Sequence, residues 1–113
     1  MKYYSEDQMK DTRLAFEAKI LTWPHVTMKK MFGCPCYQAD GRLFAFLVTG
    51  GVVITQLSEA DREMLSKQYR TAPFQAGKKI VQNWLRVSID DKRDLDRIIP
   101  FVRKSYTSSL SKT

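Results

Sequence analysis

The sequence predicts a two-layer α+β domain in which helices at the N-terminus, in the middle and at the C-terminus pack on an antiparallel sheet. Both ends of the chain carry apolar residues at helical spacing. The stretch between them divides into short apolar runs separated by Gly-containing turn signals. Such short turns join only antiparallel neighbours. The expected sheet is a meander of three to four strands plus one later strand, and this element order is typical of an α+β domain.

Length and composition indicate a single folded domain. The chain has 113 residues, of which 43% are hydrophobic and 12% aromatic, which suits one domain with its own core. We expect the domain to cover residues 1–106 and residues 107–113 to form a flexible tail. The longest apolar run, residues 43–48, is too short to span a bilayer. The first residues lack the apolar region of a secretory signal, so a cytoplasmic protein is expected.

The first element is a helix from Ser5 to Leu21, with Ser5 as the N-cap and Trp23-Pro24 as the stop signal. It carries two apolar stripes. One of them can pack on the sheet and consists of Leu14, Ala18 and Leu21. The other consists of Met9, Phe16 and Ile20 and must meet either a second helix of the same domain or a partner, and it is the candidate contact surface for a partner protein or a homodimer.

Extended segments follow the first helix. We expect strands over Val26 to Phe32, Cys36 to Ala39, Arg42 to Thr49 and Val52 to Leu57. Asp40-Gly41 is a strong signal for a two-residue hairpin turn, because both central residues of a type I′ turn need positive φ. In the Arg42 to Thr49 segment, Leu43, Ala45 and Leu47 alternate with Phe44, Phe46 and Val48, so both faces are apolar and the strand should be covered.

The remaining elements are a helix from Ser58 to about Tyr69, a loop over Thr71 to Lys79, a strand over Ile80 to Ile89, and a last helix capped by Asp90 or Asp91. Pro100 removes a backbone donor within this last helix. We therefore expect a kink or break at Ile99-Pro100 and a frayed end over Ser105 to Thr113.

An ordered series of short motifs suggests a family. The series is Met31-Phe32-Gly33-Cys34-Pro35-Cys36, Asp40-Gly41-Arg42-Leu43-Phe44-Ala45, Leu57-Ser58-Glu59-Ala60-Asp61-Arg62 and Ala72-Pro73-Phe74. Over roughly residues 28 to 105 the chain resembles the TfoX N-terminal domain family. The resemblance implies a stand-alone α+β domain related in shape to YjbR-like and secretion-chaperone-like folds. It also implies a part in regulating bacterial natural competence, and it supplies no catalytic residues.

The motif Met31-Phe32-Gly33 has two interpretations. Phe32 can form a ligand-contacting edge, or it can enter the core before a turn glycine, and we predict the second. Cys34 and Cys36 are expected as reduced, structural thiols. A closed metal site needs about four ligands and the chain has one histidine, His25, while a Cys-His pair requires the hairpin to fold back.

Other chemistry is weakly indicated. Gly77-Lys78-Lys79 lacks the Gly and the Ser or Thr that a phosphate-binding loop needs. Asp90 and Asp91 suit a helix start better than acid-base catalysis. The sequence therefore predicts no enzyme, no cofactor, no metal and no small-molecule substrate.

Charge is the feature that stands out. The formal net charge is +7, and residues 73–113 hold nine basic and four acidic side chains. The candidate nucleic-acid contacts are Lys29, Lys30, Lys78, Lys79 and Arg86, although a solvated basic face is the simpler interpretation. Our leading hypothesis is a non-enzymatic regulatory or protein-interaction module. The alternative is sequence-nonspecific nucleic-acid binding through the basic C-terminal third.

Overall fold

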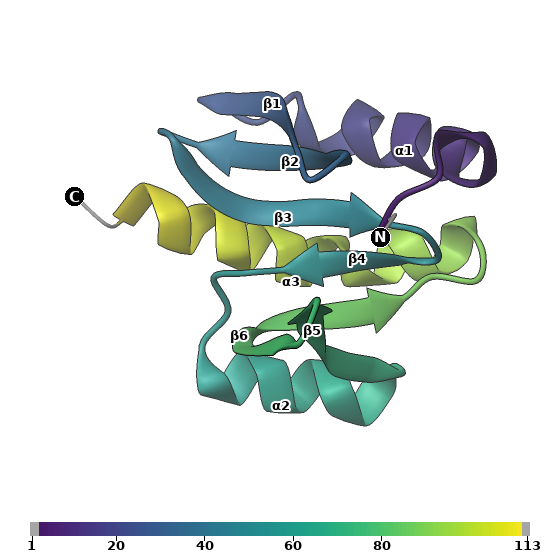
Figure 1. Ribbon diagram of the computed structural model, residues 1–113. Coiled ribbons are helices and arrows are strands. Elements are labelled where there is room, and N and C mark those ends of the chain that lie inside the picture. The colour runs from purple at the N-terminus through teal and green to yellow at the C-terminus, as the bar shows by residue number, and fades with distance from the viewer. Residues whose placement is uncertain (1–2, 112–113) are drawn as a thin grey trace.

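The computed structural model describes residues 3–111, including the side chains of all of these except Lys92 and Ser111. This part of the chain forms three helices and a six-stranded antiparallel sheet (Figure 1). The elements are α1 (Glu6–Ile20), β1 (Val26–Met31), β2 (Cys34–Ala39), β3 (Arg42–Val48), β4 (Gly51–Ile54), α2 (Glu59–Gln68), β5 (Thr71–Ala76), β6 (Lys79–Ser88) and α3 (Lys92–Ser111). The predicted α+β class is confirmed. No helix within residues 3–111 is both long and apolar enough to cross a bilayer.

The strand order is β1-β2-β3-β4-β6-β5. The first four strands form the predicted meander, and β6, the predicted later strand, pairs with β4. The turn at Asp40-Gly41 has positive φ at both residues, as the type I′ prediction requires. Ser58 caps α2 as expected, because its hydroxyl accepts a hydrogen bond from the Asp61 amide at 3.2 Å.

One strand was not predicted. The loop expected over Thr71 to Lys79 is wrong, because Thr71–Ala76 forms β5 and pairs with β6 through a short turn at Gly77. Pro73 suggested a break in regular structure. An edge strand tolerates proline, because one side of such a strand needs no hydrogen-bond donors. The pairing register also shifts between Pro73 and Phe74, where an irregularity in β6 accommodates the change.

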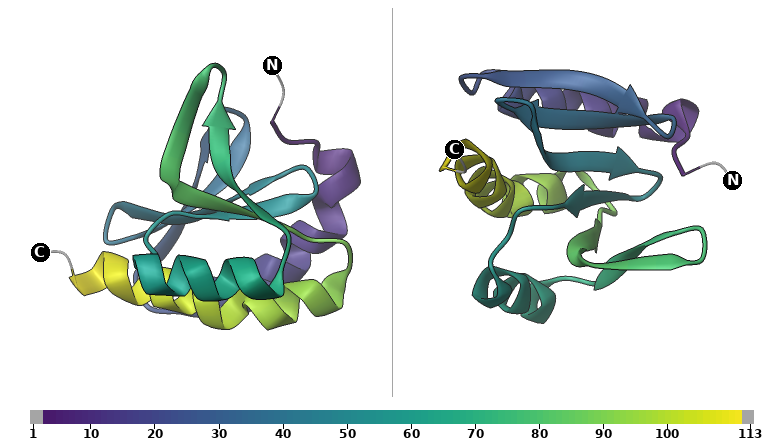
Figure 2. Two further views of the ribbon diagram at one scale, coloured as in Figure 1. Left: turned by 90° about the horizontal axis from the view of Figure 1, so that it is seen from below. Right: turned by 60° about the vertical axis from the view of Figure 1, so that its left-hand side comes forward.

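The helices cover one face of the sheet. Figure 1 views the sheet from the side that carries no helix, with α1 and α3 behind it. In the left view of Figure 2, α2 and α3 lie side by side below the sheet, and the β5–β6 hairpin stands away from them. An ion pair between Lys104 on α3 and Asp61 on α2, at 3.0 Å, fits this arrangement. The opposite face of the sheet, which we call the open face, has no helix of the described residues over it.

A bulge in β3 decides which side chains reach the open face. Leu43 pairs with Gln38 and Ala45 pairs with Tyr37, so Phe44 is an extra residue in β3. The Phe44 ring packs against Tyr106 of α3, with ring centroids 5.5 Å apart. The simple alternation expected for this strand is therefore wrong, since Phe44 and Phe46 point to opposite sides.

Helix α3 is longer and more regular than expected. Asp91 caps it by accepting hydrogen bonds from the amides of Arg93 at 2.7 Å and Asp94 at 3.2 Å. The helix continues through the exposed Pro100, so the expected break there is wrong. It also continues through residues 107–111, where Ser109 is fully buried, because its inner face stays packed on the sheet. The predicted flexible tail is wrong for those residues, while residues 112–113 lie outside the described part of the chain.

Candidate binding groove on the open face of the sheet

An apolar groove lies on the open face between the β1–β2 and β5–β6 hairpins. It has a volume of about 400 Å³. Its walls come from both hairpins, from β3 and from the N-terminal segment. The lining residues are Tyr3, Met31, Phe32, Cys34, Cys36, Leu43, Phe46, Phe74, Ala76, Gly77, Lys79, Val81 and Trp84. Leu43 and Phe46 are three positions apart in one strand, and they share this face only because of the bulge at Phe44.

The floor of the groove is a cluster of aromatic rings. Phe46 packs edge to face against Phe74, with centroids 5.1 Å apart, and against Trp84 at 5.5 Å. Tyr3 packs on Phe74 at 5.7 Å. Phe46 and Phe74 are buried, and Tyr3 and Trp84 are half-buried. Mutually packed rings hold the floor in one shape, so the groove exists without an occupant.

Phe32 stands at the rim of this groove, in the turn between β1 and β2. Its side chain is 81% exposed. Its φ is +56° and that of Gly33 is +76°, which are the left-handed values of a type I′ turn. Left-handed backbone costs a bulky residue roughly 1–2 kcal/mol. The prediction that Phe32 enters the core is wrong, and its alternative, a ligand-contacting edge, fits the structure.

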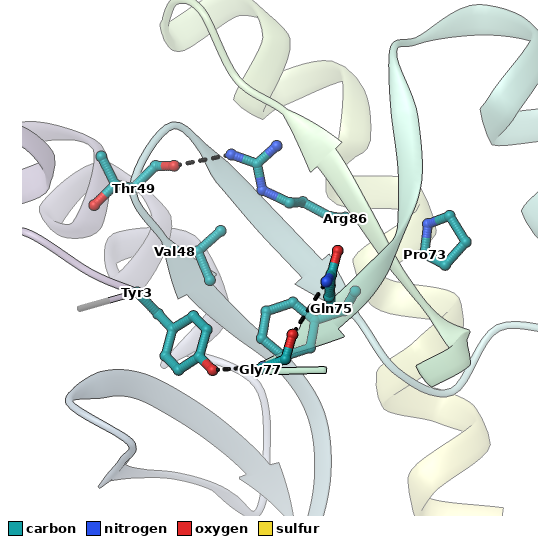
Figure 3. A pocket seen from close by; sticks show the side chains of 8 residues that line it. Tyr3, Val48, Thr49, Pro73, Gln75, Gly77 and Arg86 are labelled. Carbon is teal, nitrogen blue, oxygen red and sulfur yellow. Dashed lines mark hydrogen bonds between the residues drawn. The ribbon is translucent and has the colours of Figure 1, made fainter. Parts of the chain in front are cut away.

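A second, more polar recess adjoins the groove and shares Tyr3, Phe74 and Gly77 with it. Its volume is about 510 Å³. Figure 3 shows Arg86 extending toward Thr49, and the hydroxyl of Tyr3 beside Gly77. The guanidinium donates a hydrogen bond to the Thr49 carbonyl oxygen at 3.0 Å, and the Tyr3 hydroxyl accepts one from the Gly77 amide at 3.0 Å. Groove and recess together form one surface, apolar at one end and cationic at the other.

The five basic candidates do not form a single patch. Lys79 lines the groove and Arg86 lines the recess. Lys29 pairs with Cys36, and paired residues of neighbouring strands project to the same side, so Lys29 also belongs to the open face. Lys30 lies on the other side of β1, close enough to Glu6 of α1 to help lower the pKa of that carboxyl group. Lys78 is exposed in the β5–β6 turn.

The proposed partner contacts on α1 are buried within this chain. Met9 is 5% exposed, and Phe16 and Ile20 are fully buried. Phe16 packs edge to face on Tyr37 of β2 at 5.3 Å. The prediction that these three residues meet a partner is therefore wrong, because the helix turns this stripe toward the sheet. The other stripe is the exposed one, with Leu14 49% and Leu21 44% accessible.

A polar network fixes α1 against the sheet. The Tyr37 hydroxyl donates to Glu17 at 2.6 Å, Arg13 bridges Glu17 and Glu6 at 2.9 and 2.8 Å, and the Tyr4 hydroxyl donates to Glu6 at 2.6 Å. Burial, followed by the hydrogen bond to Glu17, raises the pKa of Tyr37. The Arg13 and Tyr4 hydrogen bonds lower the pKa of Glu6 to about 2. These groups hold the helix in place and lie away from the groove.

Cys34 and Cys36 line the wall of the groove, and no described residue activates either thiol. Burial raises the pKa of Cys34 to about 11 and also raises the pKa of Cys36, which disfavours the thiolate form. His25 precedes β1 at the far end of the hairpin, one strand length or roughly 20 Å away along the chain direction. The structure therefore does not bring the Cys-His pair together. Among the described residues, no group of three or more His, Cys, Asp or Glu side chains gathers to hold a metal ion.

Comparison with known proteins adds no family. No family model matches the chain, and no curated protein matches it in sequence. The resemblance to the TfoX N-terminal domain stays a prediction from the ordered motifs.

Proposed function

We propose that this chain is a non-enzymatic regulatory module, similar to the TfoX N-terminal domain and acting in the bacterial cytoplasm, that binds an apolar segment of a protein partner in the open-face groove. Phe32 carries the proposal. Its ring leaves a large apolar surface exposed to solvent, and its backbone has the left-handed φ that is unfavourable for a bulky residue, so both features lower the stability of the free chain. Binding would offset this loss of stability, because covering such a ring contributes roughly 2–3 kcal/mol.

The surroundings of the groove support a protein segment as the occupant. Apolar pockets flanked by aromatic anchors are where binding energy concentrates in protein interfaces. Within residues 3–111, the charged residues that line the groove and recess are Lys79 and Arg86, and none of the lining residues is acidic. Charge complementarity therefore favours an apolar segment from an acidic partner over a second copy of this basic chain.

Peptide pools test this proposal without knowledge of the natural partner. The probes are short acetylated and amidated peptides in which every second residue is Leu, Ile, Phe or Met and one remaining position is Glu. Binding to the ¹⁵N-labelled chain is followed by NMR. We expect shifts of the Phe32, Cys36 and Trp84 signals, and roughly tenfold weaker binding by Phe32→Ala. The matched control Leu14→Ala, an exposed apolar residue on α1, should bind normally. Absence of shifts at millimolar peptide would contradict the proposal.

Single-stranded nucleic acid is the second candidate. The observation that favours it is the position of Lys29, Lys79 and Arg86 around a face that carries Phe32 and Trp84, since single strands bind where basic side chains flank aromatic ones. A labelled oligothymidylate should then bind with an affinity that falls steeply with salt. The Lys29→Gln, Lys79→Gln double variant should weaken binding, while Lys30→Gln, on the other side of β1, serves as the control. Equal binding by both variants would remove this candidate.

A further inference from the structure

The recess beside the groove contains a half-buried arginine that the fold uses only in part. Arg86 lies near the C-terminal end of β6, paired with Val53 of β4 and Ala72 of β5, so its backbone position is fixed on both sides. Its side chain crosses the open face and reaches the Thr49 carbonyl oxygen at 3.0 Å. This contact holds the guanidinium at the border of the recess and uses one of its nitrogens (Figure 3).

The charge of Arg86 has no carboxylate partner among the described residues. A guanidinium offers five N–H donors in a planar fork, and one hydrogen bond to a carbonyl oxygen neither neutralises the charge nor uses the fork. By contrast, Arg13 on α1 makes two ion pairs, with Glu6 and Glu17. A charge held in a half-buried position without a counter-ion lowers stability, unless a ligand supplies the counter-ion.

The other groups in the recess suit a small anion. Gln75 and Thr49 border it, and Pro73 and Val48 close its sides. Among the described residues that line the recess, Arg86 is the one cation, which matches a single negative charge better than a phosphate or a chain of phosphodiesters. Tyr3 and Phe74 form the boundary with the apolar groove, so a ligand that occupies both carries its anion next to an apolar part.

We propose that the recess is a carboxylate subsite, in which Arg86 receives an Asp or Glu side chain of the bound segment while the neighbouring apolar side chains of that segment fill the groove. This inference rests on the proposed function, because it specifies the partner of the same surface. A side-chain carboxylate, unlike a terminal one, lets the segment continue from the recess into the groove, which adjoins it at Tyr3, Phe74 and Gly77. Arg86 then determines specificity, and the groove supplies most of the contact area.

Two matched peptide pools test the subsite. Both have alternating Leu, Ile, Phe or Met, and they differ by Glu or Gln at the remaining positions, with every placement represented. We expect the unmodified protein to bind the Glu pool about tenfold more tightly, in line with a charge-assisted hydrogen bond. Arg86→Gln should abolish this preference and Arg86→Lys should keep part of it. Arg97→Gln, an exposed arginine on α3, should keep all of it.

A second measurement does not depend on the folding of a variant. In the unmodified protein, the side-chain Nε–H signal of Arg86 should shift on addition of the Glu pool and stay in place with the Gln pool. If both pools bind equally and the Arg86 variants behave alike, the subsite is wrong while the proposed function stands. If neither pool binds, the proposed function fails and the subsite with it. The assignment to an acidic side chain would be overturned if the protein bound the Gln pool with a free C-terminal carboxylate, or oligothymidylate, more tightly than the Glu pool.

Discussion

The hydroxyl of Ser105, buried in the middle of α3, donates a hydrogen bond to the carbonyl oxygen of Phe44 at 2.7 Å. The same oxygen accepts the Thr55 amide of the neighbouring segment at 3.2 Å, and the Ser105 oxygen accepts the Gln56 amide at 3.0 Å. The carbonyl oxygen of the bulged residue therefore accepts from a backbone amide and from a helix side chain, and Ser105 fastens α3 to β3 at the bulge. Because the bulge directs Phe46 to the open face, Ser105 helps to shape the groove from the opposite side of the sheet.

Replacing Ser105 by alanine should therefore have two effects: it should lower the free energy of unfolding, and it should alter the shape of the groove. The change removes the hydrogen bonds that the Ser105 hydroxyl makes with the Phe44 carbonyl oxygen and the Gln56 amide, and each such hydrogen bond contributes about 1 kcal/mol. Urea unfolding measures the loss, and the NMR signals of Phe46 and Trp84 report the groove. Ser108→Ala, one turn further along α3 and half-exposed, is the control and should leave both unchanged. A stability loss with unchanged Phe46 signals would argue against the link to the groove.

The sequence was informative where local rules decide the structure. The spacing of apolar residues predicts the first and last helices, and the cap signal at Ser58 predicts the middle one. The Asp40-Gly41 signal predicts the hairpin between β2 and β3, because all of these features depend on neighbours in the chain. Prediction failed at β5, where Pro73 is a strand residue only because that strand lies at the sheet edge. It also failed for α3, whose last turns stay helical because Tyr106 and Ser109 are buried against distant parts of the chain.

The groove was largely hidden in the sequence. Leu43 and Phe46 come to one face through an extra residue in β3, and alternation cannot reveal this without the pairing register. The stripe of Met9, Phe16 and Ile20 was assigned to a partner because the sequence does not say which side of an apolar helix meets the sheet. One signal was available. Phe32-Gly33 occupies the same kind of turn as Asp40-Gly41, and an aromatic residue in that left-handed position is rare enough to suggest a function.

Gly51 is a second position at which a small substitution should disturb the sheet, through the pairing of β4 with β6. A Cβ built on Gly51 would lie 2.7 Å from the Val87 carbonyl oxygen, which belongs to the paired strand β6 and cannot move aside easily. Gly51→Ala should cost about 1–3 kcal/mol by forcing β4 and β6 apart. Gly77→Ala is the comparison, since it meets open space and carries only the strain of φ +61°, roughly 1 kcal/mol. Equal losses in urea unfolding would show that the contact with Val87 is not restrictive.

Acid should weaken the attachment of α1. The pKa of Glu6 is lowered from 4.5 to about 2 by hydrogen bonds from Arg13 and Tyr4. Because the folded state binds this proton less readily than the unfolded state, the stabilisation is complete above pH 4.5 and is lost as the pH falls toward 2. Glu6→Gln should flatten the decline of stability across this range. Urea unfolding at several pH values measures it, with Asp7→Gln as the control, and identical pH profiles would contradict the role of Glu6.

The thiols should react slowly. The pKa of Cys34 is raised from 9.0 to about 11, mainly by burial, so at mildly alkaline pH its thiolate fraction is roughly a hundredfold below that of an ordinary cysteine. Iodoacetamide labelling followed by mass spectrometry should show slow modification that accelerates in urea. Rapid labelling of the folded chain would mean that the groove opens far more widely than its packed aromatic floor suggests.

Substitutions of Phe32 distinguish its effect on the stability of the chain from its effect on peptide binding. Asparagine tolerates left-handed φ better than phenylalanine, and a polar residue suits a position that is 81% exposed. Phe32→Asn should therefore raise the free energy of unfolding by about 1 kcal/mol while it weakens peptide binding. Phe32→Ala is the matched variant. It also removes the ring, but alanine does not favour a left-handed φ. Peptide binding should therefore fall without a comparable gain in the free energy of unfolding. If both variants instead lose several kcal/mol in urea unfolding, Phe32 packs inside the fold and the argument from its exposure fails.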